Sequence, residues 1–159
     1  MRRVPLVIDA SVAAKWIKPE VHSAHANQIL RGPYTLLAPD LLWPEVGNIL
    51  WKSVQRRELT TVEAREGLRT LLRYPITVVP GRSLVAAALE ISLQYRQTVY
   101  DALYVMLATT RKCRLVTADS PLYTTLKGTP LRTHLLWIED VPGQHQLPPP
   151  RSPHPREHE

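Results

Sequence analysis

The sequence has little of several residue types, and each shortage excludes a class of protein. Only one of its 159 residues, Cys113, is a cysteine, so the chain can form neither an internal disulfide nor a zinc cluster of cysteines by itself. We interpret Cys113 as a small apolar residue at the start of a strand. No apolar stretch approaches the roughly 18 residues that span a bilayer. The apolar run after Arg3 ends at Asp9, too early for a signal peptide, so we expect a cytosolic protein with no membrane partner.

The composition that remains is typical of one globular domain. Apolar residues make up 44% of the chain and charged residues 21%, and a chain of this length can bury a substantial core. The character changes after residue 140, because the last eighteen residues hold six of the fifteen prolines and three of the six histidines. We therefore expect a folded domain over residues 1–140 and a disordered Pro/His-rich tail over residues 141–159.

Short apolar runs alternate along the chain with segments of helical period. Strands are predicted at residues 4–8, 34–38, 76–79, 115–117 and 135–138. Helices are predicted at residues 12–17, 21–30, 41–57, from 60 onward, 83–95, 99–110, and in a short stretch after Pro121. Apolar strands that alternate with helices predict a short parallel sheet, of about five strands, covered by helices on both faces. The expected fold class is α/β with three layers.

Polar residues at the predicted helix starts suit the role of caps. Ser11 and Asp40 are candidate N-caps for the helices at 12–17 and 41–57, and Thr60 and Glu63 have the spacing of a capping box. The helices at 41–57 and from 60 onward would form a hairpin. Its second arm would place four apolar residues on one face: Ala64, Leu68, Leu71 and Leu72.

Two acidic residues follow predicted strands directly. Asp9 follows the apolar pair Val7-Ile8, and Asp119 follows the run at 115–118. The carboxyl ends of parallel strands meet at one edge of a sheet, where ligands bind in open α/β folds. Each aspartate alone could equally be a turn or cap residue. As a pair they predict a site at this edge of the sheet.

Two further acids lie on predicted helices. Asp101 interrupts a helix that is apolar nearly all round, and it would occupy the third helical position if Thr98 is the N-cap. That capping role is a structural alternative to a role in a site, although one carboxylate can serve both. Glu45 shares a polar stripe with Asn48 and Lys52, and an ordinary solvated helix face would look the same.

A convergence of these four acids would require neutralisation. Four carboxylates in a partly buried crevice repel one another unless protons or a cation compensate their charge. The candidates include no histidine or cysteine, and ligands that are all oxygens favour Mg²⁺ or Mn²⁺ over zinc. A carboxylate-held Mg²⁺ keeps several waters, one of which can attack phosphorus. The chemistry implied is hydrolysis of a phosphodiester.

Four segments resemble those of a known enzyme family in order and approximate spacing. They are Val7-Ile8-Asp9-Ala10-Ser11, Pro44-Glu45-Val46-Gly47-Asn48-Ile49-Leu50, Tyr100-Asp101-Ala102-Leu103-Tyr104 and Leu115-Val116-Thr117-Ala118-Asp119. The chain resembles the PIN-domain ribonucleases, in particular the VapC-type toxins of toxin–antitoxin pairs, over roughly residues 4 to 138. The Pro/His-rich tail lies outside that pattern.

The resemblance implies a PIN-like fold and a Mg²⁺-dependent endoribonuclease that acts on RNA. It also implies a homodimer and inhibition by a cognate VapB-type antitoxin. The acidic cluster that would bind the metal and catalyse cleavage comprises Asp9, Glu45, Asp101 and Asp119. The supporting polar groups would be Ser11, Asn48 and Thr117.

Basic residues outnumber acidic ones, twenty to fourteen, and fifteen of the twenty are arginine. The resulting net charge of +6 favours a polyanionic partner, although a solvated basic surface would have the same composition. Candidates for contacts with RNA phosphates are the bases nearest the acids in the sequence: Lys15, Lys52, Arg56 and Arg57.

Large apolar residues on the hairpin have two interpretations. Trp43 and Trp51, together with Leu42 and Leu50, could form an exposed patch for a partner helix or a second copy of the chain. Residues of this size belong to the core more often than to an interface.

Two rival functions remain open at this point. A noncatalytic RNA-binding module could use the same fold, but the intact set of four acids disfavours it. A phosphotransferase with Asp9 as nucleophile would resemble the haloacid-dehalogenase type, which has a paired Asp-x-Asp. Here Ser11 occupies the second position.

Overall fold

The computed structural model describes residues 2–143, so the predicted disorder of residues 144–159 lies outside the described part of the chain. Five parallel strands form one sheet in the order β3-β2-β1-β4-β5. The strands are β1 (Val4–Ile8), β2 (Tyr34–Pro39), β3 (Ile76–Val79), β4 (Arg114–Thr117) and β5 (Leu135–Trp137). All five lie where the apolar runs predicted them, within two residues at each end.

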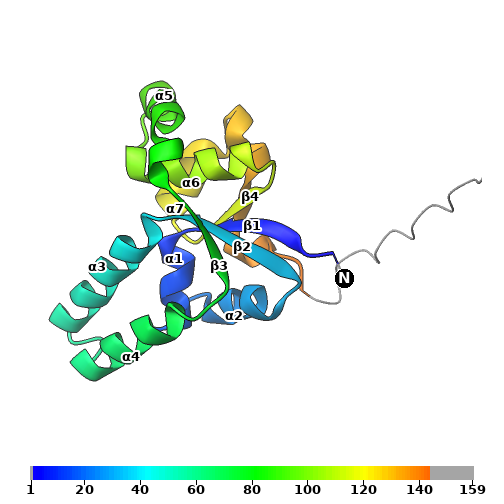
Figure 1. Cartoon of the computed structure of the whole chain (residues 1–159). Coiled ribbons are helices and arrows are strands. Elements are labelled where there is room, and N and C mark those ends of the chain that lie inside the picture. Colours follow the sequence, from blue (N-terminus) through cyan, green and yellow to red (C-terminus); the bar gives the residue numbers. More distant parts are fainter. Residues whose placement is uncertain (1, 144–159) are drawn as a thin grey trace, which may run out of the picture.

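Seven α-helices surround the sheet. They are α1 (Ala10–Ala13), α2 (Ser23–Arg31), α3 (Leu42–Gln55), α4 (Thr61–Leu71), α5 (Val85–Tyr95), α6 (Val99–Thr110) and α7 (Ser120–Leu126). Short 3₁₀ turns are η1 (Ala14–Trp16), η2 (Gly81–Ser83), η3 (Pro130–His134) and η4 (Ile138–Asp140). Figure 1 shows α5 and α6 on one side of the sheet and α1 and α2 on the other, with the α3–α4 hairpin extending away from it. The predicted three-layer α/β fold is confirmed.

The central strand β1 lies between β2 and β4. Val7 is in register with Leu37 on one side and with Leu115 on the other. Val7 and Leu115 are completely buried, because helices cover both faces of the sheet. The carboxyl ends of β1 and β4 are therefore neighbours, and the residues that follow these strands leave the sheet at the same edge.

Two predicted caps are wrong, one because a neighbouring residue takes the capping position and the other because of a distant contact. Asp9, not Ser11, caps the first helix, since its carboxylate accepts from Val12 N–H at 3.1 Å, and the helix begins at residue 10 and passes into η1. Asp40 does not cap α3. Its carboxylate accepts instead from the N–H of Gly81, on the loop after β3, at 2.9 Å.

The α3–α4 hairpin follows its predicted local chemistry with one exception. The capping box at the start of α4 is confirmed, because Thr60 Oγ1 accepts from Glu63 N–H at 3.1 Å and the Glu63 carboxylate accepts from Thr60 N–H at 2.7 Å. Leu71 is fully buried, as expected. Leu72 is 56% exposed, so its predicted place on the buried face is wrong, because α4 ends at residue 71.

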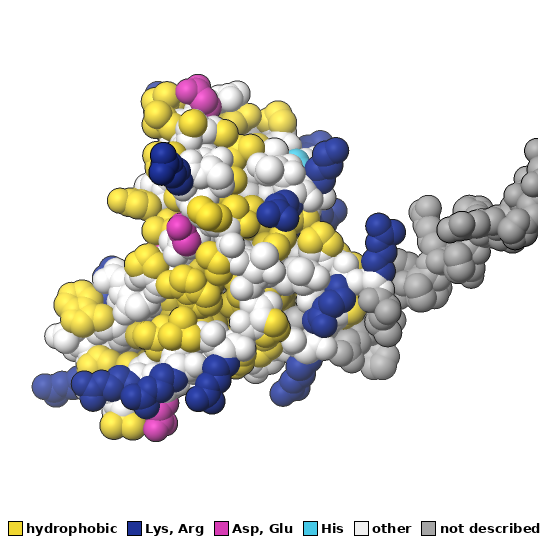
Figure 2. Space-filling view, viewed as in Figure 1, with side chains coloured by type: hydrophobic (Ala, Val, Ile, Leu, Met, Phe, Trp, Pro, Cys, Tyr) yellow, Lys and Arg dark blue, Asp and Glu magenta, His cyan; other side chains and the backbone are white. Residues whose placement is uncertain are grey.

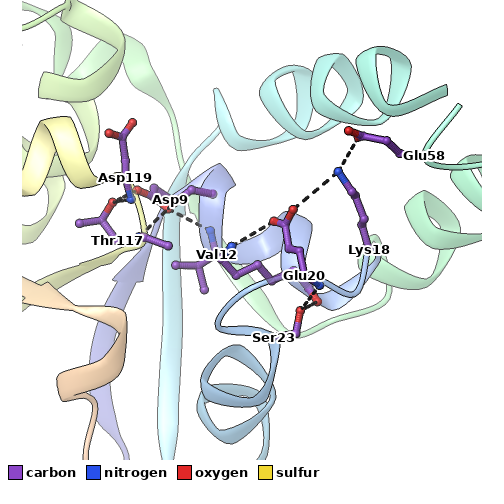
Figure 3. A network of polar contacts seen from close by, with 11 residues as sticks. Asp9, Val12, Lys18, Glu20, Ser23, Glu58, Thr117 and Asp119 are labelled. Carbon is purple, nitrogen blue, oxygen red and sulfur yellow. Dashed lines mark hydrogen bonds and ion pairs between the residues drawn. The ribbon is translucent and has the colours of Figure 1, made fainter. Parts of the chain in front are cut away.

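The hairpin is closely tied to the segment that follows η1. At Gly67 on α4, a Cβ atom would lie 2.2 Å from Ile17 Cγ2, so only glycine permits this approach. An ion pair joins Lys18 to Glu58 at the turn between α3 and α4, and Lys18 also lies 3.6 Å from Glu20 (Figure 3). These contacts fix α3 relative to α1.

Three further features concern the ends of the domain and membrane crossing. Cys113 is buried directly before β4, as predicted. Val141 is buried in the core, and the carbonyl of Pro142 accepts a hydrogen bond from the Tyr34 hydroxyl at 2.9 Å. Within residues 2–143, no helix is long and apolar enough to cross a membrane.

Candidate active site

All four predicted acids line one pocket at the carboxyl edge of the sheet. The pocket has a volume of about 140 Å³ and is lined by Asp9, Ala10, Ser11, Glu45, Ile49, Asp101, Tyr104, Asp119 and Leu122. The acids come from four places in the fold: the end of β1, helix α3, helix α6 and the turn between β4 and α7. The sheet and the two helices thus bring together residues up to 110 positions apart in the sequence.

A larger cavity, of about 250 Å³, lies elsewhere, between η1 and α4. Its walls include Trp16 and Tyr74, whose rings meet edge to face, and the carboxylates of Glu63 and Glu66. Glu63 belongs to the capping box. None of the four predicted acids lines this cavity, so we assign the candidate active site to the smaller pocket.

Asp9 is the most tightly held acid of the site. Its carboxylate accepts hydrogen bonds from the hydroxyl groups of Ser11 and Thr117, each at 2.5 Å, and from Val12 N–H at 3.1 Å (Figure 3). Burial raises the pKa of this carboxyl to about 6, although the three hydrogen bonds favour the ionised form. The negative charge of Asp119 raises the pKa further. Protonation of Asp9 therefore falls close to neutral pH.

The two hydroxyl groups that hold Asp9 also connect β1 to β4. Ser11 Oγ accepts from Ala118 N–H at 3.1 Å, and Thr117 Oγ1 accepts from Asp119 N–H at 3.0 Å. Asp119 in turn caps α7, where its carboxylate accepts from Leu122 N–H at 3.1 Å. The predicted supporting groups Ser11 and Thr117 thus contact the site directly.

Asp101 occupies the position that the capping alternative predicted, and it also lines the pocket. Thr98 is the N-cap of α6, and its Oγ1 accepts from Asp101 N–H at 3.1 Å. Burial raises the pKa of the Asp101 carboxyl, and the charge of Asp119 adds to this effect, while the Thr98 hydroxyl opposes it. The cap uses the backbone N–H of Asp101, whereas its carboxylate lines the pocket.

Glu45 enters the pocket from the first turn of α3. Burial raises the pKa of its carboxyl, as do the charges of Asp101 and Asp9, while the nearby Tyr104 hydroxyl lowers it. Glu45 Oε1 is nevertheless buried without a hydrogen-bond partner. The interpretation of Glu45 as part of a solvated helix face is therefore wrong, because its carboxylate lies in the pocket.

The other predicted site residues do not line the pocket. Asn48 is exposed, and its neighbour Ile49 faces the acids instead. Lys15 forms an ion pair with Glu20 at 3.0 Å. The remaining predicted phosphate contacts are exposed and lie toward or beyond the end of α3: Lys52, Arg56 and Arg57.

One pocket residue, Tyr104, was not predicted as a site residue, although it belongs to the motif that contains Asp101. It lies three residues after Asp101, so the two side chains share a face of α6. That spacing is the only sequence signal that could have assigned it to the site. Burial raises the pKa of its hydroxyl, and the charges of Glu45, Asp9 and Asp101 raise it further.

The donor atoms of the pocket suit a hard divalent cation. Four carboxylates line it, and one buried carboxylate oxygen, Glu45 Oε1, has no hydrogen-bond partner among the described residues. Among residues 2–143, no three His, Cys, Asp or Glu side chains already converge as a complete set of metal ligands. The pocket therefore offers oxygen donors around a common space, and side-chain rotation would have to complete a ligand set.

The apolar residues of the hairpin divide between core and surface. Leu42 and Leu50 are buried, so their predicted place in an exposed patch is wrong. Both side chains belong to the buried face of α3. Trp43 is half-buried, whereas Trp51 is 59% exposed. Trp51 is thus the accessible anchor of this helix.

Comparison of sequences identifies relatives over most of the chain. Residues 6–125 match the family model of the PIN domain. Ribonuclease VapC3 from Pyrobaculum aerophilum is 34% identical over 119 residues, which cover 74% of this chain and 91% of that protein. VapC ribonuclease Mb0985 from Mycobacterium bovis is 32% identical over 114 residues, which cover 72% of this chain and 85% of that protein.

Solved structures share the fold. The crystal structure of PAE2754 from Pyrobaculum aerophilum superposes with a TM-score of 0.64 at 25% identity, covering 86% of this chain and 85% of that one. VapC20 from Mycobacterium tuberculosis, a toxin that cleaves the sarcin-ricin loop, gives 0.60 at 13% identity, covering 76% of this chain and 95% of that one. From the family match and the identity to its relatives, the chain belongs to the PIN-domain family and to its VapC-type ribonucleases.

Proposed function

We propose that the chain is a metal-dependent endoribonuclease, the toxin of a toxin–antitoxin pair, which hydrolyses phosphodiester bonds of RNA. The observation that carries this proposal is the pocket at the carboxyl edge of the sheet, which is lined by Asp9, Glu45, Asp101 and Asp119. Burial raises the pKa of three of these carboxyls, those of Asp9, Glu45 and Asp101. A site that resists the ionisation of its own carboxylates is one that a cation would stabilise.

The four acids would together hold Mg²⁺ or Mn²⁺, since all their donor atoms are oxygens. A divalent cation bound there supplies an activated water as nucleophile and stabilises negative charge on the phosphate. The chain's own contribution is to fix the ligands. Ser11 and Thr117 hold both oxygens of Asp9, and the N-terminus of α7 holds Asp119. Ligands that are fixed in advance need little rearrangement when a substrate binds.

Contacts with RNA would come from the basic surface around the pocket. Lys52, Arg56 and Arg57 are exposed and available for phosphates, whereas Lys15 would first have to leave Glu20. Figure 2 shows a further row of basic side chains along the edge of the molecule where α4 lies. These charges would attract RNA of any sequence, because phosphate contacts position the substrate without reading its bases.

Regulation and assembly complete the proposal. A cognate antitoxin of the VapB type would inhibit the enzyme by occupying the pocket, with the exposed Trp51 of α3 as an apolar anchor. The chain would also form a homodimer. A toxin–antitoxin complex from Klebsiella pneumoniae shares this fold with a TM-score of 0.59 at 12% identity, covering 86% of this chain and 99% of that one.

The decisive experiment measures cleavage of single-stranded and structured RNA by the purified chain. Cleavage should require Mg²⁺ or Mn²⁺ and should stop in EDTA, and an Asp9→Asn variant purified in parallel should be inactive in every buffer. Activity that persists in EDTA but is absent from Asp9→Asn would refute metal dependence. RNA binding without cleavage in any metal would instead support a noncatalytic RNA-binding module.

A further inference from the structure

Tyr104 has a buried hydroxyl group that forms no hydrogen bond of normal geometry with a described residue, although the Glu45 carboxylate is near enough to interact with it. The side chain is 2% exposed, and its hydroxyl has no hydrogen-bond partner within residues 2–143. Its neighbours Leu103 and Val105 are buried, and α6 packs on β1, β2 and β4, so the ring is held rigidly. A buried hydroxyl without a partner destabilises a fold. Phenylalanine would fill the same space without that cost, so the hydroxyl calls for a functional explanation.

The hydroxyl belongs to the candidate active site. Tyr104 lines the pocket together with Glu45, Asp9 and Asp101, and its hydroxyl interacts electrostatically with all three carboxylates. A phenol is a hydrogen-bond donor at neutral pH, and a carboxylate is an acceptor. The donor without a partner therefore lies among acceptors, one of which, Glu45 Oε1, also lacks a partner.

Glu45 is the acid that most needs a fixed orientation. Asp9 accepts three hydrogen bonds, and Asp119 is fixed as the cap of α7. Asp101 donates its backbone N–H to Thr98 Oγ1 at the start of α6, and the Thr98 hydroxyl also interacts with the Asp101 carboxylate. Glu45 has a longer and more flexible side chain than the three aspartates. Among residues 2–143, Tyr104 is the neighbour whose side chain can donate a hydrogen bond to the Glu45 carboxylate.

We infer that Tyr104 is a positioning residue for the cleavage reaction: when a cation is bound, its hydroxyl donates a hydrogen bond to the Glu45 carboxylate and so fixes that carboxylate toward the cation. This inference rests on the proposed metal-dependent function. It gives α6 two roles, since the same face presents the ligand Asp101 and, one turn later, the group that orients a ligand from α3. Partners that orient metal ligands in this way typically change metal affinity when they are removed.

The test is a Mn²⁺ titration of the RNA-free chain by calorimetry or by paramagnetic resonance. Tyr104→Phe removes only the hydroxyl and should weaken Mn²⁺ binding by roughly 10- to 100-fold while the melting temperature does not fall. In a Glu45→Ala background, which removes the acceptor, Tyr104→Phe should cause no further loss. The matched control is Tyr34→Phe, which removes another buried hydroxyl, the one bonded to Pro142, and should leave Mn²⁺ affinity unchanged.

Several outcomes would overturn the inference. Unchanged Mn²⁺ affinity in Tyr104→Phe would refute it while leaving the proposed function intact, and a lower melting temperature at unchanged affinity would make the hydroxyl purely structural. An equal loss of affinity with and without Glu45→Ala would show that the hydroxyl acts on another group. If the unsubstituted chain neither binds Mn²⁺ nor cleaves RNA, the proposed function fails and the inference fails with it.

Discussion

Replacement of Asp9 by asparagine should stabilise the metal-free fold at pH 8 and destabilise it at low pH. Burial raises the pKa of Asp9 to about 6 from the 3.8 of an exposed aspartate. The folded state therefore binds the proton more tightly than the unfolded state does. The stability that this group contributes is fully present below about pH 4 and is lost as the pH rises through about 6. The difference of about two pH units corresponds to about 3 kcal/mol.

Asparagine recovers only part of this free energy, because it offers one acceptor where aspartate offers two. Its carbonyl can still accept from Val12 N–H, but either Ser11 or Thr117 loses its acceptor. One lost hydrogen bond costs about 1 kcal/mol, so the net gain at pH 8 should be about 1–2 kcal/mol. At pH 4.5, where Asp9 of the folded parent chain is protonated, the same loss should make the variant the less stable protein.

The assay is urea unfolding in EDTA at pH 4.5 and at pH 8, comparing the unsubstituted chain with Asp9→Asn. The surface variant Asp140→Asn is the matched control, since it removes an equal charge from an exposed position and should show no comparable pH dependence. The reasoning is refuted if Asp9→Asn is less stable than the parent at pH 8. It is equally refuted if the difference between the two chains is the same at both pH values.

Three other perturbations have defined outcomes. Asp101→Asn should reduce RNA cleavage by a factor on the order of 10² or more without lowering stability, and a fall of several degrees in its melting point would mean that helix capping is its main role. Trp51→Ala should remove most of the affinity for a cognate antitoxin peptide, as measured by calorimetry. Two control variants should keep that affinity: Leu93→Ala, at a 69% exposed site on α5, and a deletion of the Pro/His-rich tail. Gly67→Ala should lower the midpoint of urea unfolding, because its Cβ would meet Ile17 Cγ2 at 2.2 Å; an unchanged midpoint would show that α4 shifts freely.

The sequence was informative where a structural cause is local. The ends of the apolar runs placed Asp9 and Asp119 at the carboxyl edge of the sheet, because burial of a parallel strand on both faces leaves a continuous apolar signature. The capping box of Thr60 and Glu63 involves only adjacent backbone and was found correctly. Thr98 was correctly identified as the N-cap of α6 for the same reason, since its hydroxyl accepts from the nearby N–H of Asp101.

The sequence failed where distant contacts decide. Ser11 and Asp40 are both good capping residues, but the Ser11 hydroxyl bonds to Asp9 and Ala118, and Asp40 bonds to Gly81, forty-one positions away. Tyr104 was indistinguishable from a core residue, because an apolar helix gives no sign that one hydroxyl lacks a partner. Such a feature emerges only after the helix is placed against the pocket.

The strand order has a consequence for when the pocket assembles during protein synthesis. Strand β1 is made first, but its neighbour β4 and the following Asp119 are made when about three quarters of the chain has been translated. Until then Asp9 lacks the Thr117 hydroxyl and the edge of the pocket that β4 supplies. A nascent or prematurely terminated chain that ends before β4 therefore contains three of the four acids but no assembled site. The parallel topology therefore prevents the four acids from forming the pocket until β4 has been synthesised.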